Sequence, residues 1–97
     1  MKLLSICVPS YNDAAMLQKT LDNLLSLSEI PTIEIVISDN NSSDNSQAVL
    51  KSFKDASQGR FAIYVQESNL GFRGNLAFLS SMATSDYVWF LGIGECI

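Results

Sequence analysis

An alternation of four short apolar runs with three segments of helical spacing constrains this fold more than any other feature of the sequence. The runs are residues 3–8, 33–38, 61–66 and 87–91. Strands that alternate with helices in this way form a parallel sheet covered by helices on both faces. We therefore expect an α/β, Rossmann-like three-layer sandwich with β-α-β-α-β-α-β order and strand order 3-2-1-4. A ligand crevice is then expected at the switch point between the first and fourth strands.

The three helical segments carry signals for where each helix begins. Asn12 or Asp13 can cap the first helix by accepting from a free backbone N–H. Asp44, with Gln47 three residues later, resembles a capping box at the start of the second. The third is expected over roughly residues 75–83. Apolar spacing predicts that the first helix buries one stripe, which consists of Ala14, Leu17, Leu21, Leu24 and Leu25.

Length and charge limit the class of protein. The chain has 97 residues, which suits one domain, and 47% of them are hydrophobic, which indicates a folded protein. The net charge is −4 and no basic patch is visible, which argues against nucleic-acid binding and against an anionic membrane surface. No histidine is present, so histidine-based triads, bases and metal sites are excluded.

The termini and cysteines indicate a location. The apolar run at residues 3–8 stops at Pro9 and is too short for a signal peptide, and no run of about 20 apolar residues exists. We expect a soluble, cytoplasmic chain, at the inner face of the membrane in a longer protein. Cys7 and Cys96 form no metal-type spacing and are expected to be free thiols, although a disulfide is compatible with neighbouring strands.

Short polar side chains follow the second apolar run at residues 39–44. Two interpretations are open from the residues alone. Asp39 points at a small molecule, because the carboxyl ends of strands in such sheets bind ligands. Alternatively, these residues only build a loop and cap the next helix. The crevice is expected between the loops at residues 9–12, 39–44 and 92–95.

Four motifs in this order resemble the donor-binding half of a family 2 glycosyltransferase with the GT-A fold. They are SICVPSYN at residues 5–12, EIVISDNNSSD at 34–44, NLG at 69–71 and DYVWFL at 86–91. The resemblance covers residues 4–95. It implies transfer of a sugar from a nucleotide-sugar, of the UDP or dTDP type, to an acceptor hydroxyl.

The resemblance also implies roles for individual residues. Tyr11 would border the nucleobase, and Pro9 would shape the turn that presents it. Asp39 would accept the N3–H of uracil or thymine, because a carboxylate accepts from a donor N–H. Asn41 and Ser42 would shape the base pocket, and Arg73 would meet the diphosphate through its guanidinium. The residues alone also allow Tyr11 to pack at the sheet edge and Arg73 to be an exposed loop cation.

The metal site is where the chain departs from the family pattern. The family places an acidic cluster after the fourth strand, where two carboxylates hold Mg²⁺ or Mn²⁺ against the diphosphate. Here the matching positions are Ile93, Gly94 and Glu95. Only Glu95 offers a side-chain oxygen, so the resemblance implies at most a weak metal ligand at Glu95. No catalytic base is expected among these residues.

We therefore expect one domain, the truncated N-terminal donor-binding half of a glycosyltransferase in polysaccharide or cell-surface glycan synthesis, inactive by itself. Its partners would be a nucleotide-sugar and a glycan or lipid-linked acceptor. One alternative is a noncatalytic nucleotide-binding or assembly module that has lost the metal site, and another is a flavodoxin-like domain. The apolar fourth strand at residues 87–91 leaves an open sheet edge, which predicts self-association.

Overall fold

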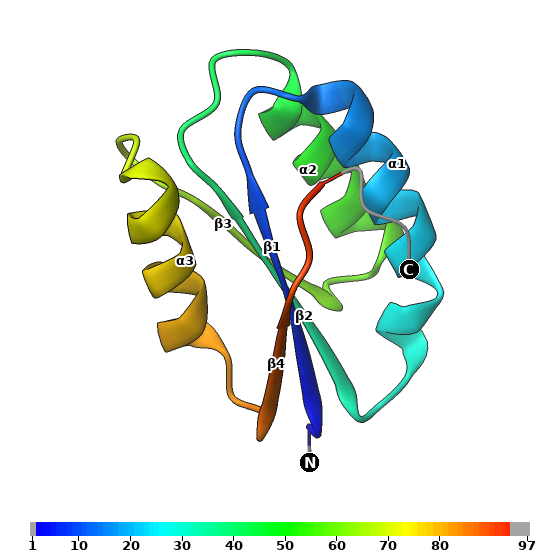
Figure 1. The fold of residues 1–97 in the computed structure, drawn as a ribbon. Coiled ribbons are helices and arrows are strands. Elements are labelled where there is room, and N and C mark those ends of the chain that lie inside the picture. The colour runs from blue at the N-terminus through cyan, green and yellow to red at the C-terminus, as the bar shows by residue number, and fades with distance from the viewer. Residues whose placement is uncertain (1, 94–97) are drawn as a thin grey trace.

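The computed structural model describes residues 2–93. Strands and helices alternate along the chain, with one additional short 3₁₀ helix, as the sequence predicts (Figure 1). The elements in order are β1 (Leu4–Ser10), α1 (Ala14–Leu25), η1 (Leu27–Glu29), β2 (Ile33–Asp39), α2 (Ser46–Ala56), β3 (Phe61–Val65), α3 (Gly71–Met82) and β4 (Tyr87–Phe90).

The described strands form one parallel sheet in the order β3-β2-β1-β4, which confirms the predicted topology. Leu4 of β1 lies opposite Ile33 of β2 and Tyr87 of β4, so the strands begin at the same end of the sheet. Their carboxyl ends therefore also meet at one edge. The chain leaves β1 toward β2 and β3, and returns through α3 to β4 on the other side of β1, which makes the carboxyl ends of β1 and β4 the switch point.

Helices cover the sheet on both faces: α1 and α2 lie on one face and α3 on the other (Figure 1). Side chains of a strand point alternately to the two faces, so each strand contributes to both layers. The core beneath α1 and α2 is the larger one and consists of Ile6, Val8, Leu17, Leu21, Leu24, Ile35, Ile37, Val49, Leu50, Phe53, Phe61 and Leu91. The core beneath α3 consists of Cys7, Val36 and Leu79.

The start of α1 follows the sequence prediction and the start of α2 does not. Asp13 is the N-cap of α1, where its Oδ1 accepts from Met16 N at 3.5 Å. The capping box predicted at Asp44 and Gln47 is wrong, because α2 begins one residue later with Asn45 as N-cap. Gln47 Nε2 instead donates to the carbonyl oxygen of Ser42 at 3.2 Å.

Helix α3 begins at Gly71, four residues earlier than the predicted Asn75. The two glycines at 71 and 74 and the NLG motif suggest a loop when they are read locally. Hydrogen bonds from Asn40 at the end of β2 hold residues 69–71 in place, so tertiary contacts override the local preference. The earlier start carries the first turn of α3 to the switch point.

The free edge of the sheet at β4 is apolar, as expected. Tyr87, Val88, Trp89 and Phe90 are all exposed. Cys7 is a free, buried thiol, and Cys96 lies outside the described residues. Burial, with a smaller effect of the Glu34 charge, raises the pKa of the Cys7 thiol to about 11. Within residues 2–93, none of the helices has the length and apolar character needed to cross a membrane.

Candidate functional site

The loops that follow β1 and β2 are joined by hydrogen bonds. Asn12 N donates to Ser42 Oγ at 2.9 Å, and Ser43 N donates to Asn12 Oδ1 at 2.8 Å. Asn12 and Asn41 have left-handed backbone conformations, with φ of 48° and 64°. Asparagine tolerates this region better than most residues, because its short side chain bonds locally. The Asn and Ser residues of these loops therefore fix the shape of this edge of the sheet.

Asp39 lies at the centre of this arrangement and is fully buried. Its Oδ1 accepts from Ser42 Oγ at 2.6 Å and from Ser10 Oγ at 3.3 Å. Its Oδ2 accepts from Ser42 N at 2.9 Å. A buried carboxylate needs such donors, because an unpaired buried charge is costly. In this structure Asp39 organises the loop after β2 and presents no surface to solvent.

Asp44 joins the beginnings of two helices. Its Oδ1 accepts from Ser46 N at 2.9 Å, at the first residue of α2, and its Oδ2 accepts from Ala14 N at 3.1 Å, at the first residue of α1. Hydrogen bonds from Ser46, and then from Ala14, hold the pKa of the Asp44 carboxyl below its usual range. Asp44 thus ties the first residue of α2 to the first residue of α1.

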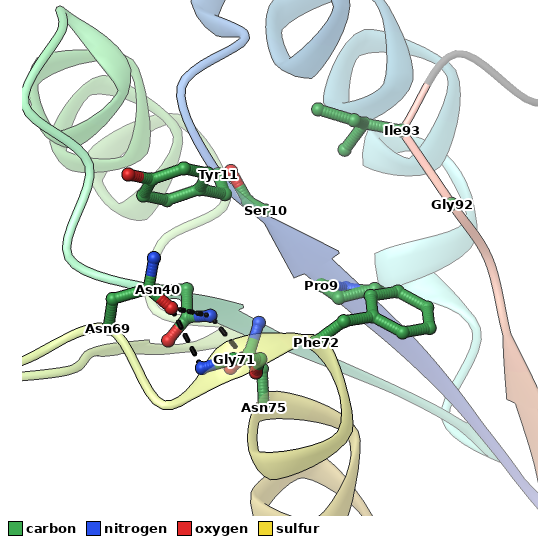
Figure 2. Close-up of a pocket in the computed structure, with 10 residues that line it drawn as sticks. All are labelled: Pro9, Ser10, Tyr11, Asn40, Asn69, Gly71, Phe72, Asn75, Gly92 and Ile93. Carbon is green, nitrogen blue, oxygen red and sulfur yellow. Dashed lines mark hydrogen bonds between the residues drawn. The ribbon is translucent and has the colours of Figure 1, made fainter.

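Asn40, the residue after β2, holds the start of α3. Its Oδ1 accepts from Leu70 N at 2.8 Å. Its Nδ2 donates to Asn69 Oδ1 at 2.9 Å and to the carbonyl oxygen of Gly71 at 3.2 Å (Figure 2). Asn69 Oδ1 also accepts from Gly71 N at 2.8 Å. We call this set of hydrogen bonds the Asn40 clamp. It fixes the NLG motif at the carboxyl end of the sheet.

A second amide, that of Asn75, attaches α3 to β2. Asn75 is buried; its Oδ1 accepts from Ser38 Oγ at 2.5 Å, and its Nδ2 donates to the carbonyl oxygen of Ser38 at 3.0 Å. Ser38 Oγ in turn accepts from Gln66 Nε2 at 3.0 Å. Hydrogen bonds to Ser38 of β2 thus position the first two turns of α3. Gln66, which follows β3, supports Ser38 in turn.

A cavity of about 390 Å³ opens at the switch point, between the ends of β1 and β4 and the start of α3 (Figure 2). Its position is the one that open α/β sheets use for ligands. The volume falls in the range of small-molecule sites, which are roughly 300–1,000 Å³. The lining residues are Pro9, Ser10, Tyr11, Asn40, Asn69, Gly71, Phe72, Asn75, Gly92 and Ile93.

The residues predicted for the site divide into two groups. Pro9 and Tyr11 line the cavity. Asp39, Asn41, Ser42 and Arg73 do not belong to its lining, and the direct contacts predicted for them stay predictions. Glu95 lies outside the described residues. Residues from each of the loops at 9–12, 39–44 and 92–95, between which the sequence predicts a crevice, line the cavity, and the start of α3 lines it as well.

Sequence reasoning missed the amides and the phenyl ring of the lining, namely Asn40, Asn69, Asn75 and Phe72. A signal for Asn40 was present. Ser38 and Asn40 follow the parity of the strand on the α3 face, whereas Asp39 belongs to the face of α1 and α2. The contribution of α3 to the cavity lining could not be predicted from local sequence, because it depends on the Asn40 clamp, which joins residues far apart in the chain.

The described residues do not form a metal site of the kind that the family pattern implies. Gly92 and Ile93, which follow β4, have no side-chain oxygen. Among residues 2–93 no group of three or more acidic, cysteine or histidine side chains is close enough together to hold a metal ion. The donor set within this range therefore does not fit Mg²⁺ or Mn²⁺.

Comparison with known proteins decides the family. The family model described as glycosyl transferase family 2 matches residues 5–92. The chain belongs to this family. A validoxylamine A glucosyltransferase of Streptomyces hygroscopicus subsp. jinggangensis is 36% identical over 72 residues, which are 73% of this chain and 16% of that protein. The chain spans between 15% and 29% of the length of the curated relatives it matches.

Solved structures confirm the GT-A fold. Residues 1–349 of S. aureus TarS in complex with UDP-GlcNAc superpose with a TM-score of 0.74 at 23% identity, covering 95% of this chain and 26% of that one. The mannosyltransferase PcManGT of Pyrobaculum calidifontis, in complex with GDP-Man and Mn²⁺, superposes with a TM-score of 0.72 at 21% identity, covering 84% and 24%. Membership of the family supports glycosyl transfer as the general activity.

Proposed function

We propose that this chain binds the nucleotide-sugar donor, of the UDP or dTDP type, of a glycosyltransferase. The transferred hexose goes to a hydroxyl of a glycan or lipid-linked acceptor in polysaccharide or cell-surface glycan synthesis. The observation that carries the proposal is the cavity at the switch point, with Pro9 and Tyr11 in its lining. Membership of the glycosyltransferase family and the fold shared with TarS, which binds UDP-GlcNAc, support it.

The chemistry of the lining suits the base end of such a donor. Asn69 Oδ1 already accepts from Asn40 and Gly71, which leaves its Nδ2 to donate toward a carbonyl oxygen. Uracil and thymine carry two ring carbonyls, which only accept hydrogen bonds. Half of the Tyr11 side chain is exposed, at 49%, and its ring borders the same space (Figure 2). An aromatic face and a fixed amide donor together provide shape and direction for a flat pyrimidine.

Calorimetric titration with UDP, dTDP and GDP, each with and without Mn²⁺, tests donor binding. We expect UDP or dTDP to bind more tightly than GDP, because the larger guanine ring presents N–H donors where the pyrimidines present carbonyls. Tyr11→Ala is expected to weaken the preferred nucleotide about tenfold, the loss that removal of one base–aromatic contact produces. An absence of binding by all three nucleotides would contradict the proposal.

Transfer itself requires a base that activates the acceptor hydroxyl. The lining of the cavity, within the described part of the chain, contains no carboxylate and no imidazole. We therefore propose that these 97 residues alone do not turn over the donor and act within a longer enzyme in the cytoplasm or at the inner face of the membrane. Steady release of UDP from a UDP-sugar by this chain, with an acceptor present, would refute that part of the proposal.

A noncatalytic nucleotide-binding or assembly module is the second candidate. Ile93, at a position where the family resemblance implies a metal-binding carboxylate, favours it. The same titrations separate the two candidates. Mn²⁺ that tightens UDP binding supports a working donor site, whereas UDP binding that is indifferent to Mn²⁺, or no binding, supports the module.

A further inference from the structure

Phe72 is the most exposed residue of the cavity lining among the large hydrophobic side chains. Its exposed fraction is 70%, against 49% for Tyr11. A single exposed phenyl ring is unremarkable on a protein surface, but this one lines a cavity of the size that small-molecule ligands occupy. No role has been assigned to Phe72 by the sequence motifs or by the proposed function.

The backbone that carries Phe72 is held rigidly. The residue before it, Gly71, has φ of +76°, a conformation that side-chain-bearing residues rarely adopt. Gly71 is bonded on both sides: its N–H donates to Asn69 and its carbonyl accepts from Asn40. The ring therefore projects from a turn that the Asn40 clamp has already fixed. Phe72 therefore lines the cavity from a backbone that is fixed by hydrogen bonds.

The surroundings of the ring indicate what it can contact. In Figure 2 the Phe72 and Tyr11 rings lie on different sides of the cavity, and in this view the Tyr11 ring lies above Asn40 and Asn69. Ile93 also lines the cavity, and none of its described lining residues is charged. An uncharged phenyl ring gives nothing to a diphosphate. It gives dispersion and stacking energy to a flat, uncharged heterocycle.

We infer that Phe72 is a base-binding residue, which stacks on the pyrimidine ring of the donor and so determines that this cavity takes the nucleobase. The inference deepens the proposed function and rests on it. Stacking on an aromatic side chain tolerates any base, so Phe72 contributes affinity, while the fixed amides of the lining supply the choice among bases.

Titration of the protein with uridine, UDP and UDP-glucose tests this role. Phe72→Ala is expected to weaken all three by a similar factor of about ten, because all three share the base. The matched control is Tyr87→Ala, which removes an aromatic side chain of nearly equal exposure, 71%, on β4 and away from the cavity. The control is expected to bind like the unmodified protein. Circular dichroism establishes that both variants are folded.

Phe72→Trp provides a spectroscopic test. The chain has a single tryptophan, Trp89, which is not in the cavity lining. A new indole at position 72 is expected to retain uridine affinity and to lose fluorescence when uridine stacks on it, whereas the unmodified protein is expected to show little change. Phe72→Leu, which keeps apolar bulk without a flat face, is expected to lose affinity nearly as much as Phe72→Ala.

The outcomes separate this inference from the function on which it rests. If the unmodified protein binds uridine and UDP but Phe72→Ala binds them equally well, base stacking by Phe72 is refuted while donor binding stands. A loss confined to UDP-glucose refutes it as well, because the ring would then contact the sugar. If the unmodified protein binds none of the three, donor binding itself is refuted, and this inference with it.

Discussion

Neighbouring residues at the end of β2 have different tasks because side chains alternate along a strand. Asp39 points to the side of α1 and is buried with three hydrogen bonds, whereas Asn40 points to the side of α3 and lines the cavity. The sequence motif predicted a functional cluster at this position and favoured its charged member, Asp39, whereas the structure places Asn40 in the cavity lining. The sequence shows that Asp39 and Asn40 point to opposite faces of the sheet. It does not show which face borders the cavity, because that depends on where α3 begins.

Asp39→Asn tests the structural task of the buried carboxylate. The amide replaces one acceptor oxygen by an NH₂ group, which would face the N–H of Ser42 or the hydroxyls of Ser10 and Ser42. We expect the free energy of unfolding to fall by about 1–3 kcal/mol, the usual cost of leaving a buried hydrogen-bonding group unsatisfied. Urea denaturation measures it. Asp55→Asn, on the exposed surface of α2, is the control, and an equal effect of the two substitutions would contradict the assignment.

At the scale of elements, the helices on the two faces of the sheet are attached to it by different interactions. Apolar residues at helical spacing predicted that α1 buries one stripe, and Leu17, Leu21 and Leu24 of that stripe are fully buried. The attachment of α3 combines a small apolar cluster with the amides of Asn40 and Asn75. The sequence could not reveal this, because long-range side-chain hydrogen bonds have no periodic signature.

Leu79→Ala tests how strongly α3 depends on its small cluster. Leu79 is fully buried and packs against Cys7 and Val36. The truncation is expected to cost about 2–5 kcal/mol, because it removes buried methyl groups and leaves a space between α3 and the sheet. Ser80→Ala, at the exposed neighbouring position, is the control and is expected to change stability by about 0.5 kcal/mol or less. Thermal or urea unfolding would contradict this view if the two variants were equally stable.

For the whole molecule, the carboxylate of Glu34 connects three segments. Its Oε2 accepts from Ser5 Oγ at 2.6 Å on β1 and from Thr84 N and Oγ1 at 3.0 and 3.1 Å, in the turn that leads to β4. Partial burial tends to raise the pKa of Glu34, but the hydrogen bonds from Ser5 and Thr84 and the charge of Lys2 outweigh it and lower the pKa. The charged form is thus favoured in the folded state.

The lowered pKa of Glu34 predicts how stability depends on pH. Its contribution is complete above the pKa of an unfolded glutamate, about 4.3, and is lost as pH falls through the lower folded value. We expect about 1 kcal/mol or less, because the side chain is only partly buried and solvent screens its interactions. Glu34→Gln should therefore be less stable than the unmodified protein near pH 6, with the difference shrinking toward pH 3. A difference that is constant across this range in urea titrations would count against the assignment.

The open edge at β4 concerns the whole molecule as well. Its exposed apolar side chains and unpaired strand edge are features that promote association between sheets. We predict concentration-dependent self-association, which light scattering measures. Trp89→Lys is expected to reduce it, because a charged side chain on an edge strand opposes pairing. Lys51→Glu on α2 is the control for altered charge elsewhere. A monomer at every concentration would refute the prediction.

The Asn40 clamp has a consequence for the timing of ligand capture. Because Asn69, Leu70 and Gly71 are already bonded to Asn40, the wall that carries Phe72 stands in its final position before any ligand arrives. The entropy of ordering that wall is lost when the chain folds and not at the encounter. Nucleotide association in stopped-flow experiments should then be a single step whose rate rises linearly with concentration. With Asn40→Ala, a slower ordering step should appear, and the rate should level off.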